Sequence, residues 1–341
     1  MFKSAKLKKL SLAVATMLAA GIIAGCGGGD KKADAPKADA KKTYNVGVVQ
    51  LVEHPALDAT NKGFVDGLKK RGIEKDKNLK LDQQNAQADQ SNLKNIATRF
   101  VNNKVDLIYA IATPAAQTVA NATKTIPIVG CAITDYESAK LVEKNAKPNT
   151  NVTGASDMNP IKEQVDLLLK IVPNAKTIGT IYTSSEVNSE IQIKLMTEYA
   201  KSKGLKVEVA TISTVNDIQQ AAQSLLGKVD AFYEPTDNVV ASAMPTLTAV
   251  TTPAKKPVIC GEPGMVDGGG LATYGIDYYS LGVQAGDMAA DILEGKKKPQ
   301  DMAVQTAKDL SVVVNKDAAE AMGVKIPDDI MKNAKVVTTK K

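Results

Sequence analysis

The stretch Val229-Asp-Ala-Phe-Tyr-Glu-Pro-Thr-Asp237, followed by Asn238, predicts a buried strand that ends in a turn with helix-capping residues. An earlier stretch repeats this pattern: Val105-Asp-Leu-Ile-Tyr-Ala-Ile-Ala-Thr113, followed by Pro114. The two stretches are offset by 124 positions, so that Asp237 occupies the place of Thr113. Proteins built from alternating strands and helices hold small polar ligands where a strand runs into a helix. The repeat therefore predicts two similar lobes that share a cleft.

Further landmarks extend the repeat over most of the chain. The apolar run 177–182 repeats the run 45–50, and Gly204 repeats Gly72 at the end of a helix, both at an offset of 132 positions. From Tyr44 onward apolar strands alternate with amphipathic helices, which is typical of parallel sheets covered on both faces. A helix and a strand after the second copy indicate that the chain crosses between the lobes more than once. We predict an α/β fold of two Rossmann-like lobes with parallel sheets and a multi-crossing hinge, with these boundaries: 44–156 plus about 278–306 for lobe 1, and 157–277 plus about 307–335 for lobe 2.

The N-terminus has the features of a secretory signal. Four lysines precede an apolar run at 10–23, and small residues lead to Ile23-Ala-Gly-Cys26. This ending resembles the lipobox of bacterial lipoproteins, which implies that Cys26 receives a lipid and becomes the mature N-terminus. We expect a lipoprotein signal peptide at 1–25 and a flexible tether at 26–43. The alternatives are a plain signal peptide and a short transmembrane helix, although an apolar run of roughly 14 residues is short for a bilayer that needs about 20.

The composition argues against several classes of function. Of the 43 Lys and Arg residues, four precede Cys26, which leaves 39 against 37 Asp and Glu. This near-neutral balance and an aromatic content of 4% without Trp argue against a nucleic-acid-binding protein. A single His cannot build a His-rich metal site, and no GxSxG, HExxH or P-loop signature is present. The sequence predicts binding without catalysis, metal or cofactor, and it predicts that Cys131 and Cys260 are buried free thiols.

The candidate binding residues are polar residues in the loops that follow the strands, because ligands of such folds meet the carboxyl ends of the strands. We predict ligand contact for these residues: Gln50, Glu53, His54, Thr113, Pro114, Thr134, Asp135, Asp157, Ser185, Glu186, Asn188, Ser189, Thr236, Asp237, Asn238 and Asp277.

Two helix starts suggest how a zwitterion could be held. Thr113 would cap a helix whose free N–H groups suit a carboxylate, and Asp237 or Glu186 would balance an ammonium group. Each residue also has a purely structural alternative. Thr113 and Asp237 could only cap their helices, and Thr183-x-x-Glu186 fits a capping box.

Several motifs carry a family resemblance. Glu53-His-Pro-Ala-Leu-Asp58, Ile111-Ala-Thr-Pro-Ala-Ala116, Asn151-Val-Thr-Gly154, Ser185-Glu-Val-Asn-Ser189 and Pro235-Thr-Asp-Asn238 resemble the ABC-transporter substrate-binding family that includes bacterial tryptophan-binding lipoproteins. The similarity covers residues 44–327 in order. It implies the type I periplasmic-binding-protein fold with three crossings between the lobes. It also implies a ligand in the interlobe cleft, an aromatic amino acid such as tryptophan or phenylalanine favoured, and delivery to a membrane permease.

The expected protein is a monomeric solute-binding component, held outside the cytoplasm on the cell membrane by its lipid. Its expected partners are a small amino acid and the permease subunits, and no nucleic acid. The alternatives are a ligand sensor for a membrane receptor, a binder of another small polar solute, and a secreted enzyme on a Rossmann-like scaffold.

Overall fold

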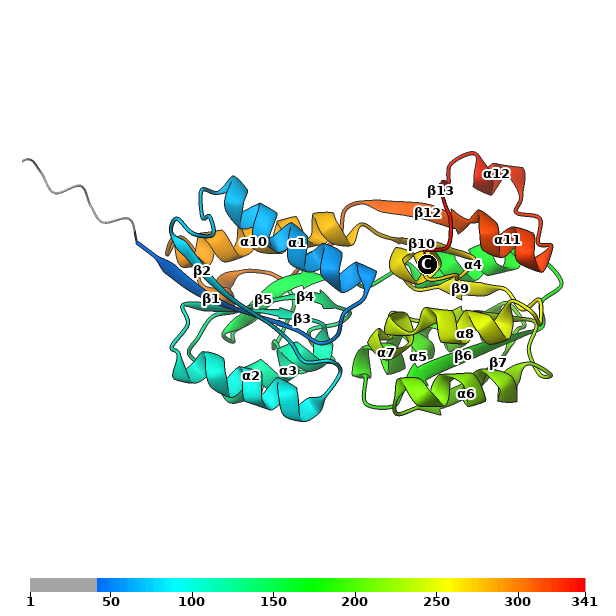
Figure 1. Cartoon of the computed structure of the whole chain (residues 1–341), viewed down its shortest axis with the longest axis horizontal. Helices are drawn as coiled ribbons and strands as arrows, with labels where there is room; N and C mark the ends of the chain where they lie inside the picture. Colours follow the sequence, from blue (N-terminus) through cyan, green and yellow to red (C-terminus); the bar gives the residue numbers. More distant parts are fainter. Residues whose placement is uncertain (1–41, 341) are drawn as a thin grey trace, which may run out of the picture. The chain divides into compact units, whose positions relative to one another are not determined.

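The computed structural model describes residues 42–340. The predicted signal peptide, Cys26 and the tether up to residue 41 lie outside the described residues. Two sheets with their covering helices form two lobes, which we call lobe 1 and lobe 2 (Figure 1). Within the described residues, no helix combines the length and the apolar character needed to cross a bilayer.

Lobe 1 is a six-stranded sheet in which every neighbouring pair is parallel. Helices α1 and α10 lie on one face and α2 and α3 on the other (Figure 1). In sheet order the strands are β11 (Gln305–Thr306), β5 (Val152–Ser156), β4 (Ile128–Ile133), β3 (Leu107–Ile111), β1 (Tyr44–Gln50) and β2 (Leu79–Asn85), and the helices are α1 (Pro55–Lys70), α2 (Gln90–Asn102), α3 (Thr113–Ala122) and α10 (Tyr278–Leu293).

Lobe 2 is a seven-stranded sheet with one antiparallel pair, β10 with β12. The strands in sheet order are β13 (Lys335–Val337), β12 (Leu310–Asn315), β10 (Ala272–Ile276), β9 (Val258–Cys260), β8 (Ala231–Glu234), β6 (Thr177–Thr183) and β7 (Lys206–Ile212). The helices are α4 (Ile161–Ile171), α5 (Val187–Ser202), α6 (Ile218–Leu225), α7 (Asn238–Ser242), α8 (Met244–Thr251), α9 (Pro263–Asp267), α11 (Lys316–Met322) and α12 (Asp328–Met331).

The predicted parallel sheets are confirmed, with β12 paired antiparallel to β10. This strand enters lobe 2 from lobe 1, and the return direction of the chain makes it antiparallel to β10. Connections pass between the lobes after β5, after β10 and after β11, which gives the hinge its three crossings.

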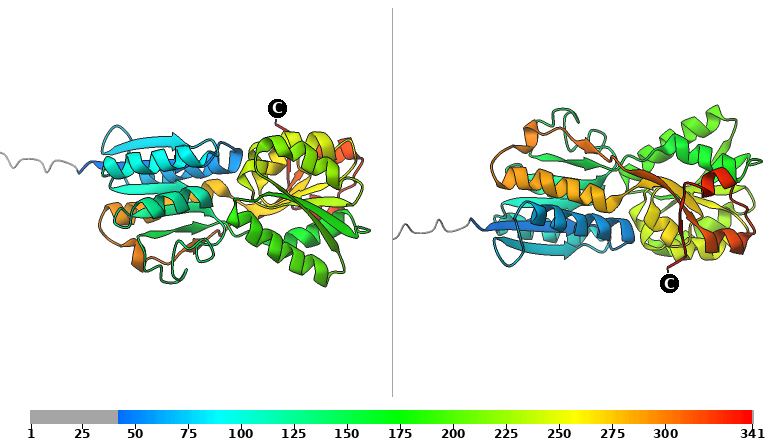
Figure 2. Two further views of the ribbon diagram at one scale, coloured as in Figure 1. Left: turned by 90° about the horizontal axis from the view of Figure 1, so that it is seen from below. Right: turned by 90° about the horizontal axis from the view of Figure 1, so that it is seen from above.

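Helix α10 leaves the second crossing and packs tightly against α1, as the view from above also shows (Figure 2, right). Glycines allow this approach. A Cβ atom on Gly63 would lie 2.1 Å from the Tyr279 carbonyl oxygen, and one on Gly282 would lie 2.2 Å from the Thr60 carbonyl oxygen. The start of α10 is thereby fixed on lobe 1 beside the crossing.

The interior of each lobe is apolar, and strands β3, β4 and β5 are buried along their whole length. Such runs are expected where helices cover both faces of a parallel sheet. Cys131 and Cys260 are free and fully buried in the two lobes, which confirms the prediction made for them.

Candidate functional site

The predicted polar residues that are buried lie after the carboxyl ends of strands from both lobes. Lobe 1 contributes His54 after β1, Thr113 after β3 and Thr134 after β4. Lobe 2 contributes Glu186 after β6 and Asn238 after β8. All five are less than a tenth exposed, although a polar loop residue of an α/β protein is ordinarily solvated.

Two buried hydrogen bonds join the lobes at this place. The Nε2 atom of His54 lies 3.4 Å from Oδ1 of Asn238. On the other side, Nε2 of Gln192 in α5 donates to Oγ1 of Thr134 at 3.2 Å. These contacts place the candidate site between the lobes rather than within either of them.

The Glu186 carboxylate organises the lobe 2 side of the site. It accepts hydrogen bonds from the Asn188 side chain at 2.8 Å, from the backbone and side chain of Asn238, and from the Val239 N–H. Burial, followed by the nearby charge of Asp237, raises the pKa of Glu186. Glu186 is the residue before α5 and makes no capping bond to it, so the alternative of a capping box formed by Thr183 and Glu186 is not realised.

Asp237 has a structural role that limits its availability. Its two oxygens accept from the Thr183 N–H at 2.7 Å, the Thr183 hydroxyl at 2.8 Å, the Ser189 hydroxyl at 2.7 Å and the Val240 N–H at 3.0 Å. The side chain is completely buried. Four donors already occupy the carboxylate, so Asp237 ties β6 and α5 to the start of α7. These contacts favour the structural alternative for Asp237 over the predicted contact with a ligand ammonium group.

Asp157 differs from Asp237 because one of its carboxylate oxygens has no hydrogen-bond partner in the described part of the chain. It lies on the first crossing, and its Oδ2 atom accepts from the hydroxyl of Tyr278 on the second crossing at 2.7 Å. Its Oδ1 atom is buried and has no partner among the described residues. Burial raises the pKa of Asp157 to about 6, although the hydrogen bond from Tyr278 lowers it.

Other residues of the site also have buried polar atoms without a hydrogen-bond partner among the described residues. The unpartnered buried side-chain atoms of residues 42–340 include His54 Nδ1, Thr113 Oγ1 and Asn188 Oδ1 as well as Asp157 Oδ1. A buried polar atom without a partner costs about 1–3 kcal/mol. Several such atoms in the loops between two lobes are typical of a site that completes its hydrogen bonds with a ligand.

Two residues of the cluster were not predicted. Asn159 is buried and its Oδ1 atom is also unpartnered; it belongs to the same loop as Asp157. Gln192 contacts both Thr134 and Thr236. Its Nε2 atom donates to Oγ1 of Thr134 and, at 2.5 Å, to Oγ1 of Thr236, and its Oε1 atom accepts from the Thr236 N–H. Helical spacing could have identified Gln192, because it lies four residues after Asn188 on the same face of α5.

Four predicted contact residues have structural partners or other surroundings in their own lobe. Asp135 accepts from the N–H groups of Glu137 and Ser138. The exposed Asp277 caps α10 by accepting from the Ser280 N–H. The remaining two are Gln50, which donates to Asp58 at 2.7 Å and accepts from Asn61, and Ser189, which donates to Asp237.

Three more predicted residues lie away from the buried cluster. Glu53 and Ser185 are exposed. Pro114 is half-buried and borders a groove of lobe 1 together with Ser185. The predicted cap at Thr113 is also corrected: α3 begins at Thr113 itself, and Ala112 is the capping residue. This shift by one residue leaves the Thr113 hydroxyl without a capping bond.

The pH dependence of the free energy of unfolding should reflect the protonation of His54. Burial lowers the pKa of His54 to about 4, so the unfolded chain binds a proton at a higher pH than the folded chain does. The free energy of unfolding should therefore fall as the pH drops from about 6.5 to about 4, by about 3 kcal/mol in total. The difference in urea-unfolding free energy between the wild type and His54→Gln measures this, since His54 is the only histidine of the chain. An unchanged difference across that window would contradict the prediction.

The geometry is that of a buried polar site between two lobes. Within residues 42–340, no group of three or more His, Cys, Asp or Glu side chains could hold a metal ion. A family model described as ABC transporter substrate binding protein matches residues 45–338. The chain belongs to this family. It is accordingly a solute-binding protein and not an enzyme, and substrate-binding proteins of ABC importers act outside the cytoplasm.

Similar proteins agree with this membership. The chain is 43% identical over 325 residues to a tyrosine-binding protein of Clostridioides difficile, covering 94% of this chain and 93% of that one. A Streptococcus pneumoniae structure described as an ABC domain in complex with L-Trp is 41% identical, with a TM-score of 0.84 and coverage of 87% and 100%. A ligand-free, open substrate-binding protein from Clostridium difficile is 45% identical, with a TM-score of 0.68 and the same coverage. This member of the family thus has the predicted type I periplasmic-binding-protein fold.

Proposed function

We propose that this protein binds an α-amino acid with an aromatic side chain between its lobes and delivers it to the permease of an ABC importer. The observation that carries the proposal is the set of buried, unpartnered polar atoms at the junction of the lobes. The relatives named for tyrosine and L-Trp support the class of ligand.

The ammonium group of the ligand is assigned to Asp157. Its Oδ1 atom is the free acceptor of a buried carboxylate, whereas the oxygens of Asp237 and Glu186 already accept from their own lobe. The Tyr278 hydroxyl fixes the orientation of Asp157. A charged partner in a dry site is the arrangement in which an ion pair contributes most.

The carboxylate of the ligand is assigned to the start of α3. The Thr113 hydroxyl is buried and unpartnered, and the first N–H groups of a helix have no acceptor within it. The positive end of the helix dipole favours an anion at the same place. His54 Nδ1 and Asn188 Oδ1 are left for the polar atom of a phenol or an indole.

The arrangement of the lobes supports a closed, ligand-holding form. The two solved relatives have nearly the same identity to this chain, 41% and 45%, yet the TM-score is 0.84 for the L-Trp complex and 0.68 for the open, ligand-free protein. Opening the lobes would separate His54 from Asn238 and Gln192 from Thr134. Hinge closure of this kind is how two-lobed binding proteins bury their ligands.

Titration calorimetry with amino acids, a sugar and a nucleoside tests the ligand class. We expect a dissociation constant below about 1 μM for at least one of L-Tyr, L-Trp and L-Phe. The matching deaminated acid, for example 3-(indol-3-yl)propionate, should bind at least about 30-fold more weakly because it leaves Asp157 unpaired. Tight binding of the sugar or the nucleoside without binding of any amino acid would refute the proposal.

We also propose that the protein is attached to the membrane by a lipid on Cys26. The proposal rests on the sequence motif, which resembles a lipobox. Mass spectrometry of the membrane-extracted protein should find a diacylated cysteine at the N-terminus, and Cys26→Ser should release the protein from the membrane. Recovery of an unmodified Cys26 from the membrane fraction would contradict the anchor.

A further inference from the structure

A groove of about 1270 Å³ lies on lobe 1, apart from one lining residue of lobe 2, Ser185, and it does not include the buried cluster. It runs along α3, the connection between β4 and β5, and the loop that follows α10. Among its lining residues are four lysines, Lys124, Lys140, Lys297 and Lys298, and neither Asp nor Glu. We call it the lysine groove.

Most of this charge is available to a partner. All four lysines are exposed, and within residues 42–340 Lys124, Lys140 and Lys298 form no ion pair. Lys297 pairs with Asp291 at 3.0 Å. Among the described residues, the ammonium group of Lys124 donates only to the carbonyl oxygen of Ala120, in the last turn of α3. The lysine groove is therefore a positive surface on a protein whose overall charge without the signal peptide is nearly balanced.

The walls of the groove are not built for one small molecule. Asn151 donates to the carbonyl oxygens of Thr123 and Ile126, and Thr150 donates to that of Leu141. None of the lining residues has a buried side-chain atom without a partner. Small-ligand sites use converging, directed polar groups, whereas flexible exposed lysines suit an extended surface of negative charge.

The position of the groove identifies that surface. Lys42, the first described residue, donates to the carbonyl oxygen of Leu293 at the end of α10. Ile292 and Gly295, which are close to Leu293 in the sequence, line the groove. The 16 residue-to-residue steps from Cys26 to Lys42 can span at most about 55 Å. If Cys26 carries a lipid, as proposed above, the groove lies beside the point where the chain leaves the lobe toward the membrane.

We propose that the lysine groove lies on the anionic phosphate headgroups of the membrane that holds the lipid, and so orients lobe 1. Each lysine near an anionic leaflet favours contact about fivefold, and three unpaired lysines favour it about a hundredfold. The attraction falls off within about 8 Å at physiological ionic strength, so it acts only where the tether lets the groove reach the membrane surface. This inference rests on the proposed anchor and adds an orientation to it.

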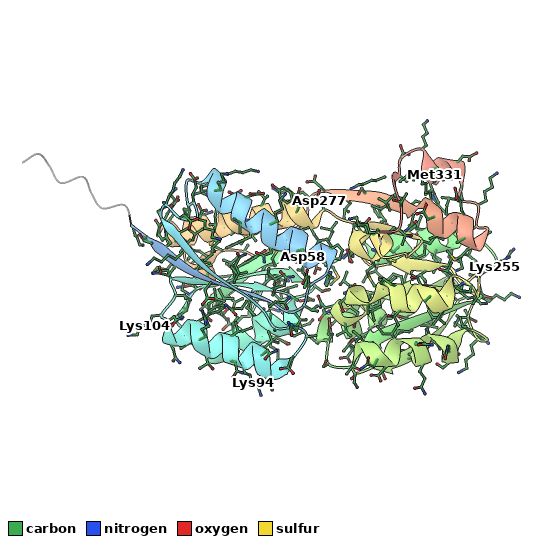
Figure 3. The ribbon with its side chains drawn as sticks, in the orientation of Figure 1. Asp58, Lys94, Lys104, Lys255, Asp277 and Met331 are labelled. Atoms are coloured by element: carbon green, nitrogen blue, oxygen red, sulfur yellow. The ribbon has the colours of Figure 1, made fainter. Side chains whose placement is uncertain are left out.

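The test uses the lipidated protein in vesicles of phosphatidylcholine alone and in an equal mixture with phosphatidylglycerol. Amine labelling read by mass spectrometry gives a rate for each lysine. In the anionic vesicles the labelling of Lys124, Lys140 and Lys298 should be slowed roughly 10- to 100-fold. Lys228 and Lys255, which lie in exposed loops of lobe 2, should be labelled at the same rate in both (Figure 3 labels Lys255).

Charge reversal separates this contact from general effects. Lys140→Glu with Lys298→Glu should restore the labelling of Lys124 in anionic vesicles. The matched control, Lys228→Glu with Lys255→Glu, makes the same change in net charge and should leave Lys124 protected. All four side chains are exposed and free of ion pairs within the described residues.

The outcomes are distinguishable from those of the proposed function. Equal labelling in the two kinds of vesicle, with flotation and amino-acid binding retained, would overturn the orientation alone. Failure to float with phosphatidylcholine vesicles would overturn the anchor and the orientation with it. Protection that requires added permease rather than phosphatidylglycerol would assign the groove to a protein partner and overturn the lipid assignment.

Discussion

Replacing Asp157 with Asn should weaken binding of the cognate amino acid by roughly 30-fold to several thousand-fold. The substitution removes the charge that we assign to the ligand ammonium group and leaves that group buried and unpaired, which costs about 2–5 kcal/mol. The Asn side chain has nearly the same volume, so the packing against Tyr278 is retained. Titration calorimetry at pH 7.5 measures the effect.

The control for Asp157→Asn is Asp277→Asn. Asp277 caps α10 and is exposed, and Asn caps helices as well as Asp does, so affinity should stay within about threefold of the wild type. Affinity of the wild type should itself fall below pH 6, because the Asp157 carboxyl has a pKa of about 6 and loses its charge there. If Asp157→Asn bound the amino acid as the wild type does, the assignment of the ammonium group would be wrong.

The same substitution should not destabilise the ligand-free protein. Burial raises the folded-state pKa of Asp157 from 3.8 to about 6, so ionisation is easier in the unfolded chain. A carboxyl whose folded pKa is raised stabilises the fold fully below its unfolded pKa, and this contribution is lost as the pH rises through the folded pKa. Above pH 6 Asp157→Asn should therefore gain stability, by up to about 3 kcal/mol, and this gain should shrink toward pH 4.

Replacing Asp237 with Ala should have the opposite signature, with a loss of about 3–5 kcal/mol in the free energy of unfolding. The change removes an acceptor that serves four donors from Thr183, Ser189 and Val240 and leaves those donors buried. Urea unfolding followed by circular dichroism measures the loss.

Asp230 offers a matched control at the other end of β6. Its carboxylate accepts from the N–H groups of Lys176 and Thr177, but the residue is only half-buried, so water can replace it. Asp230→Ala should cost about 1 kcal/mol. Equal losses in the two variants would show that the network around Asp237 is not the source of its stabilisation.

The architecture could be predicted because it depends on local patterns. Continuous apolar runs such as 107–111 and 128–133 are required by a sheet covered on both faces, and Gly72 and Gly204 end helices with positive φ angles of 76° and 78°. The antiparallel pairing of β12 could not be predicted in this way. The pattern of apolar residues predicts that a strand exists, but the direction of that strand in the sheet follows from the path of the chain between the lobes.

The sequence by itself determined which loops lie at the junction of the lobes, because residues that follow buried parallel strands must end at one edge of the sheet. Only the tertiary structure decided which of the acids is free to bind. Asp237 and Glu186 are filled by donors from separate strands and helices, whereas Asp157 receives the Tyr278 hydroxyl on one oxygen and none on the other. Hydrogen-bond satisfaction depends on partners distant in sequence, and for Asp157 that partner is 121 residues away.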